Sequence, residues 1–213
     1  MKYSHVIWDW NGTIVNDAQF CVELVNELLL EFNQEQVSLE FYLDNFQFPV
    51  SSYYSKIGLP TDSQSTNRIS SQFIINYRMR FQSCPTQDDV TACISKLNEF
   101  NVNQSVLSAG NQIDLNTFVS HYELSSYFNF ISGVSNFFAH GKADIALEHF
   151  NKLGLPTSYV LLVGDTLHDA EIAKKLGIDC LLYCGGHNSK KVLHQSTFPV
   201  IESIDEVVNW VLD

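Results

Sequence analysis

The stretch of sequence that decides the fold is residues 5–13, which read His5-Val6-Ile7-Trp8-Asp9-Trp10-Asn11-Gly12-Thr13. Its short apolar run stops at Asp9, and the turn signal Asn11-Gly12 follows at once. An apolar run of this length, bounded by a turn, is typical of a strand buried on both faces. The stretch therefore predicts a first strand over residues 4–9 that ends in a carboxylate.

Strand and helix patterns alternate beyond Pro85. Apolar runs predict further strands over residues 105–108, 128–132, 159–163, 180–183 and 198–201. Helical patterns fall between them, including residues 90–100, 141–153 and 170–176, and a final helix reaches Leu212. Alternation of this kind predicts an α/β fold with a doubly wound parallel sheet, the Rossmann-like architecture.

Residues 17–84 show helical periodicity without a strand pattern. One predicted helix face carries Cys21, Leu24, Val25, Leu28 and Phe32, and a second stripe carries Ile69, Phe73, Tyr77 and Phe81. We therefore expect two domains. Residues 1–15 and 86–213 would form the α/β core, and residues 16–85 would form a helical domain inserted after the first strand.

The composition excludes several classes of protein. The chain has 213 residues, of which 45% are hydrophobic, enough for a sizeable core and too many for general disorder. It carries 12 Lys and Arg residues against 24 Asp and Glu residues, a formal net charge of -12. Nucleic acid and anionic membrane surfaces bind basic patches, so this acid excess argues against both as partners.

The cysteines favour a reducing compartment. Their number is odd, they are scattered along the chain, and no Cys-x-x-Cys pair occurs among Cys21, Cys84, Cys93, Cys180 and Cys184. The N-terminus lacks the apolar segment of a signal peptide, and no apolar run approaches the ~18 residues of a membrane span. We expect a soluble cytoplasmic protein, with its oligomeric state left open.

Ligands of doubly wound sheets bind at the carboxyl ends of the strands. The residues predicted there are Asp9, Ser108 and Asp165, with Lys142 opening a helix nearby. Two carboxylates, a hydroxyl at a helix start and a lysine are suited to a metal-assisted phosphoryl site. A simple helix N-cap is the alternative role for Ser108.

Four segments resemble the motifs of haloacid dehalogenase-like hydrolases, in the same order along the chain. Residues 5–13 resemble the first motif, usually Asp-x-Asp-Gly-Thr, and Val106-Leu107-Ser108 resembles the second. Lys142 is similar to the third motif, and Val163-Gly164-Asp165-Thr166-Leu167-His168-Asp169 to the fourth. The helical domain is similar to the family's cap, and the subgroup in question is the phosphoglycolate phosphatase-like one.

The resemblance implies a phosphatase that acts on a small phosphorylated metabolite such as phosphoglycolate. Asp9 would be the nucleophile that attacks phosphorus and forms an aspartyl-phosphate. Ser108, the backbone at Ala109, and Lys142 would bind the phosphate, and Lys142 would also hold Asp9 in place.

The same resemblance implies Mg²⁺ as the cofactor. Carboxylate, carbonyl and water oxygens are the ligands this cation prefers. The implied ligands are Asp9, Asp165, Asp169 and the backbone carbonyl of Asn11. A favourable charge at a helix N-terminus is the plainer alternative for Asp169.

Asn11 departs from the family pattern. The family's second Asp acts as general acid for the leaving group and then as base for water, and an amide does neither. General acid–base catalysis contributes about 10²–10⁴-fold, so we expect an impaired enzyme rather than a dead one. Restoring Asp at residue 11 should then raise kcat at least tenfold.

The predicted cap contains all three arginines, Arg68, Arg78 and Arg80. They splay around a helix, so a solvated face is favoured over a patch that captures anions. Lys56 offers a Schiff base as in phosphonoacetaldehyde-type C–P hydrolases, although its surroundings read better as an amphipathic turn. His140, His168 and His187 are interpreted as supporting or surface residues.

Two other functions stay open at this point. A binding or regulatory protein that keeps the fold but has lost turnover is favoured by Asn11 and opposed by the intact nucleophile, lysine and metal carboxylates. A dehalogenase is disfavoured, because it would need neither the phosphate-binding nor the metal residues.

Overall fold

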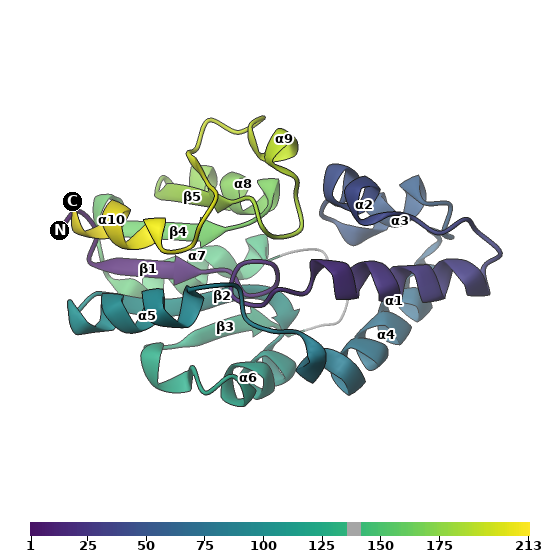
Figure 1. Cartoon of the computed structure of the whole chain (residues 1–213), viewed down its shortest axis with the longest axis horizontal. Helices are drawn as coiled ribbons and strands as arrows, with labels where there is room; N and C mark the ends of the chain where they lie inside the picture. Colours follow the sequence, from purple (N-terminus) through teal and green to yellow (C-terminus); the bar gives the residue numbers. More distant parts are fainter. Residues whose placement is uncertain (136–141) are drawn as a thin grey trace.

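In the computed structural model, which describes residues 1–135 and 142–213, six parallel strands form one sheet (Figure 1). The strands are β1 (His5–Trp8), β2 (Asn103–Asn111), β3 (Ile131–Val134), β4 (Val160–Gly164), β5 (Asp179–Tyr183) and β6 (Val200–Ile201). Their order is β3-β2-β1-β4-β5-β6. Because the order reverses between β1 and β4, the carboxyl ends of these two central strands form the topological switch point.

Helices cover both faces of the sheet. One hydrophobic cluster joins the sheet to α5 (Val90–Glu99), α6 (Gln112–His121) and α10 (Glu206–Leu212). A second joins it to α7 (Ala143–Leu153), α8 (Leu167–Leu176) and α9 (Lys190–Leu193). Val6 and Trp8 of β1 belong to the first cluster and Ile7 to the second, since successive strand residues point to opposite faces. The predicted doubly wound α/β fold is confirmed, and burial on both faces explains its continuous apolar strands.

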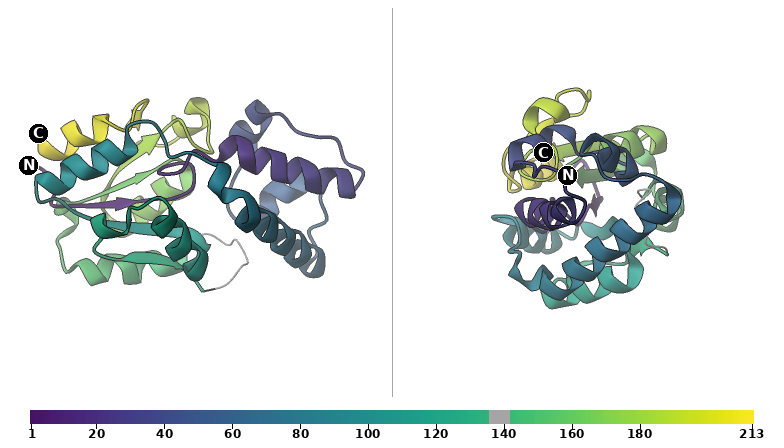
Figure 2. Two further views of the ribbon diagram at one scale, coloured as in Figure 1. Left: turned by 60° about the horizontal axis from the view of Figure 1, so that its bottom comes forward. Right: turned by 90° about the vertical axis from the view of Figure 1, so that its right-hand side faces the viewer.

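The segment between β1 and α5 is helical. It contains α1 (Ala18–Glu31), α2 (Leu39–Asn45), α3 (Val50–Lys56), α4 (Ser63–Arg80) and the 3₁₀ helix η1 (Phe81–Ser83). We call residues 18–83 the helical insertion. It lies beyond the carboxyl ends of the strands, at the end of the molecule opposite the two termini (Figures 1 and 2). The insertion is thus placed over the switch point.

The two passages of chain between core and insertion lie side by side. Val15 and Thr86 form an antiparallel bridge. Asn16 N donates to Pro85 O at 2.9 Å, and Gln87 N donates to Ile14 O at 2.8 Å. The insertion therefore leaves and rejoins the core at one point. The predicted domain boundaries, 1–15, 16–85 and 86–213, lie next to this point.

The structure corrects the predicted end of the second strand. β2 continues past Ser108, because its pairing with β3 reaches Asn111, opposite Val134, after a shift in register beyond Leu107. Helix α6 begins only at Gln112, and the Asn111 side chain caps it by accepting from Ile113 N at 3.0 Å. Placing Ser108 at a helix start, as an N-cap or otherwise, was therefore wrong.

Other boundaries shift by smaller amounts. α8 begins at Leu167, earlier than predicted, because Thr166 and Asp169 form a capping box at its N-terminus. β3 begins at Ile131, later than predicted, and Phe128 packs into the first hydrophobic cluster before the strand starts. The short helix α9 was not predicted.

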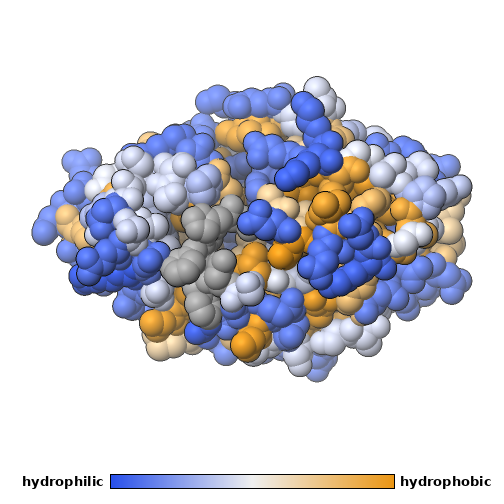
Figure 3. All heavy atoms as spheres, turned by 180° about the vertical axis from the view of Figure 1, so that it is seen from behind, coloured by the Kyte–Doolittle hydropathy of each residue, from blue (hydrophilic) through white to orange (hydrophobic). Residues whose placement is uncertain are grey.

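The core and the insertion differ in hydropathy on the back face of the molecule. On the back face, hydrophobic atoms gather mainly over the core, and the insertion is mostly hydrophilic (Figure 3). All five cysteines are free thiols. Among the described residues, no helix combines the length and the apolar character that crossing a membrane requires.

Candidate active site

Asp9 and Asp165 follow neighbouring strands at the switch point. Asp9 comes directly after β1, and its N–H donates to Val163 O of β4 at 2.9 Å. Asp165 comes directly after β4, and Asp169 lies in the first turn of α8. One carboxylate oxygen from each of the three lies within 4.8 Å of the others, and all three residues are buried. The structure thus brings together Asp9 and Asp165, which the sequence placed at this edge, and Asp169, which the resemblance implied as a further ligand.

Lys142 lies among these carboxylates. It precedes the first residue of α7, and its side chain is 2% exposed. Nζ forms ion pairs with Asp9 Oδ1 and, at 2.7 Å, with Asp169 Oδ1, and it donates to Leu107 O at 3.0 Å. Burial lowers the pKa of Lys142, but the two carboxylates outweigh it and the net shift is upward, so the ammonium stays charged. We call Asp9, Asp165, Asp169 and Lys142 the Asp9 cluster.

Asp165 is fixed by two loops, the one that carries the first motif and the one after β5. Thr13 Oγ1 donates to its Oδ1 at 2.9 Å, and His187 N donates to its Oδ2 at 2.6 Å. Gly12 has a φ of +76°, and a Cβ there would overlap the Asp165 carboxylate. Glycine is therefore required at residue 12 for both its backbone conformation and its close approach to Asp165.

Asp169 places a carboxylate at the N-terminus of α8, as the plainer alternative for it proposed, and it also contacts the site. Its Oδ2 accepts from Thr166 N at 3.0 Å and from Thr166 Oγ1 at 2.7 Å, which completes the capping box. Its other oxygen faces Lys142. Burial raises the pKa of Asp169, but Lys142 and the Thr166 hydrogen bond outweigh it, so the net shift is downward.

The Asp9 cluster fits a divalent cation by its chemistry. Burial raises the pKa of Asp9; Lys142 opposes this shift, while the Asp169 and Asp165 carboxylates add to it, and the pKa of Asp9 ends well above its ordinary value. Three buried carboxylates with one ammonium leave negative charge uncompensated. The donor atoms are all oxygens, the set that Mg²⁺ prefers. Asp9, Asp165 and Asp169 are therefore suited to hold that ion.

Ser108 still faces the site, although it is part of a strand. It is buried, and its Oγ accepts from Gly110 N at 3.0 Å. Ser108, Ala109 and Gly110 line the same cavity as Asp9 and Lys142. The hydroxyl and the strand backbone, rather than a helix N-terminus, are what this segment offers to an anion.

The side chain of Asn11 is turned toward another carboxylate. Asn11 Nδ2 donates to Asp17 Oδ2 at 2.6 Å and to the Tyr77 hydroxyl at 2.9 Å. Tyr77, on α4 of the insertion, donates in turn to Asp17 Oδ2 at 2.8 Å. The amide of Asn11 is thus held between Asp17, which directly precedes α1, and Tyr77 on α4.

Asp17 is 0% exposed and is surrounded by donors. Besides Asn11 and Tyr77, Gly12 N donates to its Oδ1 at 2.9 Å, and His187 Nε2 lies 3.2 Å from the same oxygen. Burial raises the pKa of Asp17, but His187, Asn11 and Tyr77 outweigh it and the net shift is downward. We call Asp17, Asn11, Tyr77, His187 and Cys21 the Asp17 cluster.

His187 carries the positive charge of this cluster. Burial lowers its pKa, but Asp17, Asp165 and Asp9 outweigh this and raise the pKa of His187 to about 9. Its Nδ1 lies 2.9 Å from the hydroxyl of Tyr42 on α2. The imidazolium therefore joins the core loop after β5 to Tyr42 on α2 of the insertion and to Asp17, which directly precedes α1.

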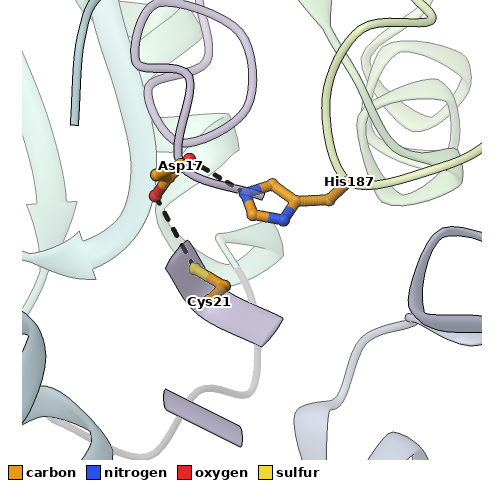
Figure 4. Close-up of side chains that lie close together, drawn as sticks. All are labelled: Asp17, Cys21 and His187. Atoms are coloured by element: carbon orange, nitrogen blue, oxygen red, sulfur yellow. Dashed lines mark hydrogen bonds and ion pairs between the residues drawn. The ribbon is translucent and has the colours of Figure 1, made fainter. Parts of the chain in front are cut away.

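Asp17, Cys21 and His187 lie close enough together to be considered as metal ligands (Figure 4). Their contacts favour a hydrogen-bonded ion pair instead. Burial raises the pKa of Cys21 well above its ordinary value, so the thiol stays protonated and donates to Asp17 Oδ2 at 3.8 Å. Asp17 already has His187 as its cation, so it lacks the uncompensated charge of the Asp9 cluster.

A cavity of about 200 Å³ lies between the core and the insertion, and residues of both clusters line it. Its core side includes Asp9, Asn11, Ser108, Lys142 and His187. Its insertion side is mainly aromatic: Tyr42, Phe46, Phe48, Tyr53, Tyr54, Phe73 and Tyr77. Tertiary packing thus turns part of the predicted helix stripe, Phe73 and Tyr77, toward a cavity.

The remaining basic candidates lie in different places. Arg68 is exposed, and Arg80 forms a two-bond ion pair with Glu27 on the surface, as expected for a solvated face. Arg78 differs, since it lines the cavity and its Nε lies 2.8 Å from Asp114 Oδ1 of α6. Lys56 is exposed and is not one of the described residues lining the cavity.

The histidines also separate. His187 is buried and central to the Asp17 cluster. His168 accepts from Lys142 N at 3.2 Å and packs against Phe48, with ring centroids 4.8 Å apart. His140 lies outside the described residues. The sequence-based prediction missed Asp17, and this is its largest omission. The available signal was a carboxylate six residues after Asn11, the position where the first motif lacks its second Asp.

Comparisons with known proteins agree with the fold. A family model described as haloacid dehalogenase-like hydrolase matches residues 6–183. A predicted phosphatase from Clostridium acetobutylicum is 19% identical, with a TM-score of 0.85, and the match covers 100% of this chain and 99% of that one. A predicted phosphoglycolate phosphatase from Haemophilus somnus is 16% identical, with a TM-score of 0.80 and coverage of 99% and 98%.

A third similar structure limits what the fold alone can say. Protein Tyrosine Kinase A from Mycobacterium tuberculosis is 18% identical, with a TM-score of 0.80 and coverage of 100% and 99%. No curated protein matches the sequence. Since phosphatase and kinase names both occur on this fold, the activity must be argued from the site.

Proposed function

We propose, from the premise that this chain belongs to the haloacid dehalogenase-like hydrolase family, that it is a Mg²⁺-dependent phosphatase working through an aspartyl-phosphate on Asp9. The observation that carries the proposal is the contact of Lys142 with both Asp9 and Asp169 beside the cavity. A buried ammonium next to a carboxylate at a strand end positions that carboxylate and attracts a phosphoryl group.

The chain's own groups account for the two displacement steps. An oxygen of Asp9 forms a bond to phosphorus as the ester P–O bond breaks, and the leaving alkoxide gains a proton from solvent. Water then attacks the phosphorus and loses a proton to solvent, and the bond from Asp9 to phosphorus breaks to release phosphate. Ser108, the Ala109 backbone and Lys142 hold the phosphoryl oxygens through both steps.

The metal would be held by Asp9, Asp165 and Asp169, with the backbone carbonyl of Asn11 as the further ligand implied by the family. When bound, Mg²⁺ neutralises carboxylate and phosphoryl charge. Without the ion we expect the protein to bind phosphate poorly, since Lys142 already faces two carboxylates.

Asn11 should slow both proton transfers. Its amide is neutral and donates to Asp17 and Tyr77, so it neither gives a proton to the leaving group nor takes one from water. Losing a general acid–base group costs about 10²–10⁴-fold. We expect slow turnover in which the aspartyl-phosphate accumulates.

We further propose that the helical insertion acts as a cap over a small phosphorylated metabolite, in a reducing, cytoplasmic compartment. The phosphoglycolate-like substrate implied by the sequence comes from the resemblance, and similar structures, the one from Haemophilus somnus among them, carry that name. The C–P hydrolase alternative loses its support, because its Schiff base would need Lys56 in the cavity.

The second candidate function is a binding or regulatory protein without turnover. The observation that favours it is the same fixed amide of Asn11. Such a protein would still bind a phosphoryl mimic at Asp9, because the lysine and carboxylates are in place.

The test is a phosphate-release assay over phosphate monoesters with and without Mg²⁺, using Asp9→Asn as the matched control. We expect Mg²⁺-dependent release by the wild type that is absent in the variant. Beryllofluoride binding to the wild type without release from any ester would favour the binding protein, and release by Asp9→Asn at the wild-type rate would contradict the nucleophile.

A further inference from the structure

The cavity beside Asp9 has two unlike sides. The core side holds Asp9, Asp169 and Lys142 of the Asp9 cluster. On the insertion side, seven of the thirteen lining residues are aromatic, and Arg78 alone among the described ones is charged. The part of a substrate beyond the phosphate would therefore meet mostly apolar surface.

Arg78 does not offset this apolar character. Its Nε lies 2.8 Å from Asp114 Oδ1, and Asp114 lines the cavity as well. The Asp114 side chain is only 15% exposed, so its charge is partly shielded from water. A carboxylate on a substrate would meet both a guanidinium and an anion of its own sign, and the attraction would largely cancel.

The other cations lining the cavity are also paired. Lys142 contacts Asp9 and Asp169, and His187 contacts Asp17. The phosphoryl group would compete for Lys142. Within the described part of the chain, each cation at the cavity thus already has a carboxylate partner, and a second anionic group would lose its hydration without gaining a cation.

The insertion side is suited to a flat, uncharged group. Aromatic rings favour stacked or edge contacts with other rings, and a volume of about 200 Å³ is small compared with pockets for drug-sized ligands. Tyr53 lines the cavity, and its buried hydroxyl has no hydrogen-bond partner among the described residues. A neutral acceptor on a ring-sized group would satisfy that hydroxyl.

We propose that the preferred substrate is a phosphate monoester whose organic group is uncharged, ring-sized and apolar or aromatic, rather than one that carries a carboxylate. Hydrolysis of this substrate rests on the proposed function, whereas its preferential binding does not. The binding preference and the phosphatase activity can therefore be refuted independently of each other.

The binding test compares three non-hydrolysable phosphonates on the wild-type protein with Mg²⁺, by isothermal titration calorimetry. Benzylphosphonate presents the apolar ring, phosphonoacetate presents a carboxylate, and 4-carboxybenzylphosphonate presents both. We expect benzylphosphonate to bind at least tenfold more tightly than either of the others. Equal or tighter binding of phosphonoacetate would overturn the proposal.

A charge variant tests the reason for the preference. Asp114→Asn removes the anion that offsets Arg78, and we expect at least a fivefold gain in affinity for phosphonoacetate, with a smaller benzyl preference. Glu99→Gln, an exposed change of the same charge on α5, is the matched control and should leave the preference as it was. The same gain in both variants would contradict the role assigned to Asp114.

Turnover separates this proposal from the proposed function. Phosphate release from benzyl phosphate at a higher kcat/KM than from phosphoglycolate supports both. Tight benzylphosphonate binding with no release from either ester would refute the phosphatase and leave the binding preference standing. Release from phosphoglycolate and not from benzyl phosphate would support the phosphatase and refute the preference for an uncharged substrate.

Discussion

Asp9 and Asp17 are both buried carboxylates beside one cavity, yet their surroundings oppose each other. Asp9 shares one ammonium with Asp169 and lies near Asp165, and its pKa is raised well above the ordinary value. Asp17 has an imidazolium, an amide, a hydroxyl and a backbone N–H around it, and its pKa is lowered. Asp9 in its ionised form therefore destabilises the fold, while ionised Asp17 stabilises it.

This difference indicates a chemical role for Asp9 and a structural role for Asp17. A carboxylate that the fold leaves poorly compensated is ready for a cation or an electrophile. A carboxylate that is fully hydrogen-bonded holds neighbouring elements together. Removing each carboxylate in turn should therefore change different properties of the protein.

The largest effect is expected for Asp9→Asn on activity. An amide cannot form the aspartyl-phosphate, so we expect kcat to fall by at least ~10³-fold, in line with losses of other nucleophiles. Thermal unfolding should show equal or higher stability, because one of three neighbouring carboxylates is neutralised. A clear loss of stability would contradict the conclusion that ionised Asp9 destabilises the fold.

Asp17→Asn should have the opposite profile. Breaking a buried ion pair by removing one partner costs about 3 kcal/mol, and here it leaves His187 without its anion. We expect that loss in the free energy of unfolding by urea titration. Asp44→Asn, which removes a surface carboxylate paired with Lys191, is the control and should cost far less. A cost below that of the control would refute the structural role of Asp17.

The Asp17 cluster should also make stability depend on pH. The pKa of His187 is about 9 in the folded protein, against 6.5 for the free side chain. The folded state thus binds more protons between these values, so the stabilisation is complete below about pH 6.5 and is lost as pH rises through 9. We expect the wild type to lose up to about 3 kcal/mol over this range, measured as the difference from Asp17→Asn, which should lack this component. Parallel pH profiles would contradict the ion pair.

The smallest change concerns Asn11 and links the two clusters. Asn11→Asp alone would put a second carboxylate where the amide now lies 2.6 Å from Asp17 Oδ2. The two groups would share a proton, so the simple gain in kcat expected from the sequence should be blunted. Asn11→Asp combined with Asp17→Asn moves the carboxylate to residue 11 without adding charge, and we expect about a tenfold rise in kcat over Asp17→Asn.

A double-mutant cycle over residues 11 and 17 measures this coupling. Additive effects of the two substitutions on kcat would show that Asp17 does not influence the role of residue 11. A tenfold gain from Asn11→Asp alone would show the same.

The parts of the site that the sequence predicts are those delivered by strand ends. Asp9 and Asp165 follow apolar runs on adjacent parallel strands, so the topology places them together whatever the loops do. Ser108 was misplaced because the register shift and the continued pairing of β2 with β3 depend on a partner strand far away in sequence. The Asp17 cluster depends on packing of the insertion against the core, since it joins residues 11, 17, 77 and 187. Local periodicity carries no information on such contacts.

The bridge between Val15 and Thr86 has a consequence for how the molecule folds. Because the two passages of chain are hydrogen-bonded to each other, the core needs only a closed loop at this point, and not a folded insertion. For residues 17–84, the length-dependent entropy of closing that loop amounts to about 4 kcal/mol. Once the loop has closed, the connecting chain transmits no force to β1 or α5 when the insertion folds or unfolds. The core and the insertion are therefore held together by contacts between folded parts, namely the shared hydrophobic cluster, the Asp17 cluster and the hydrogen bond from Ser189 to Asp44, rather than by the connecting chain.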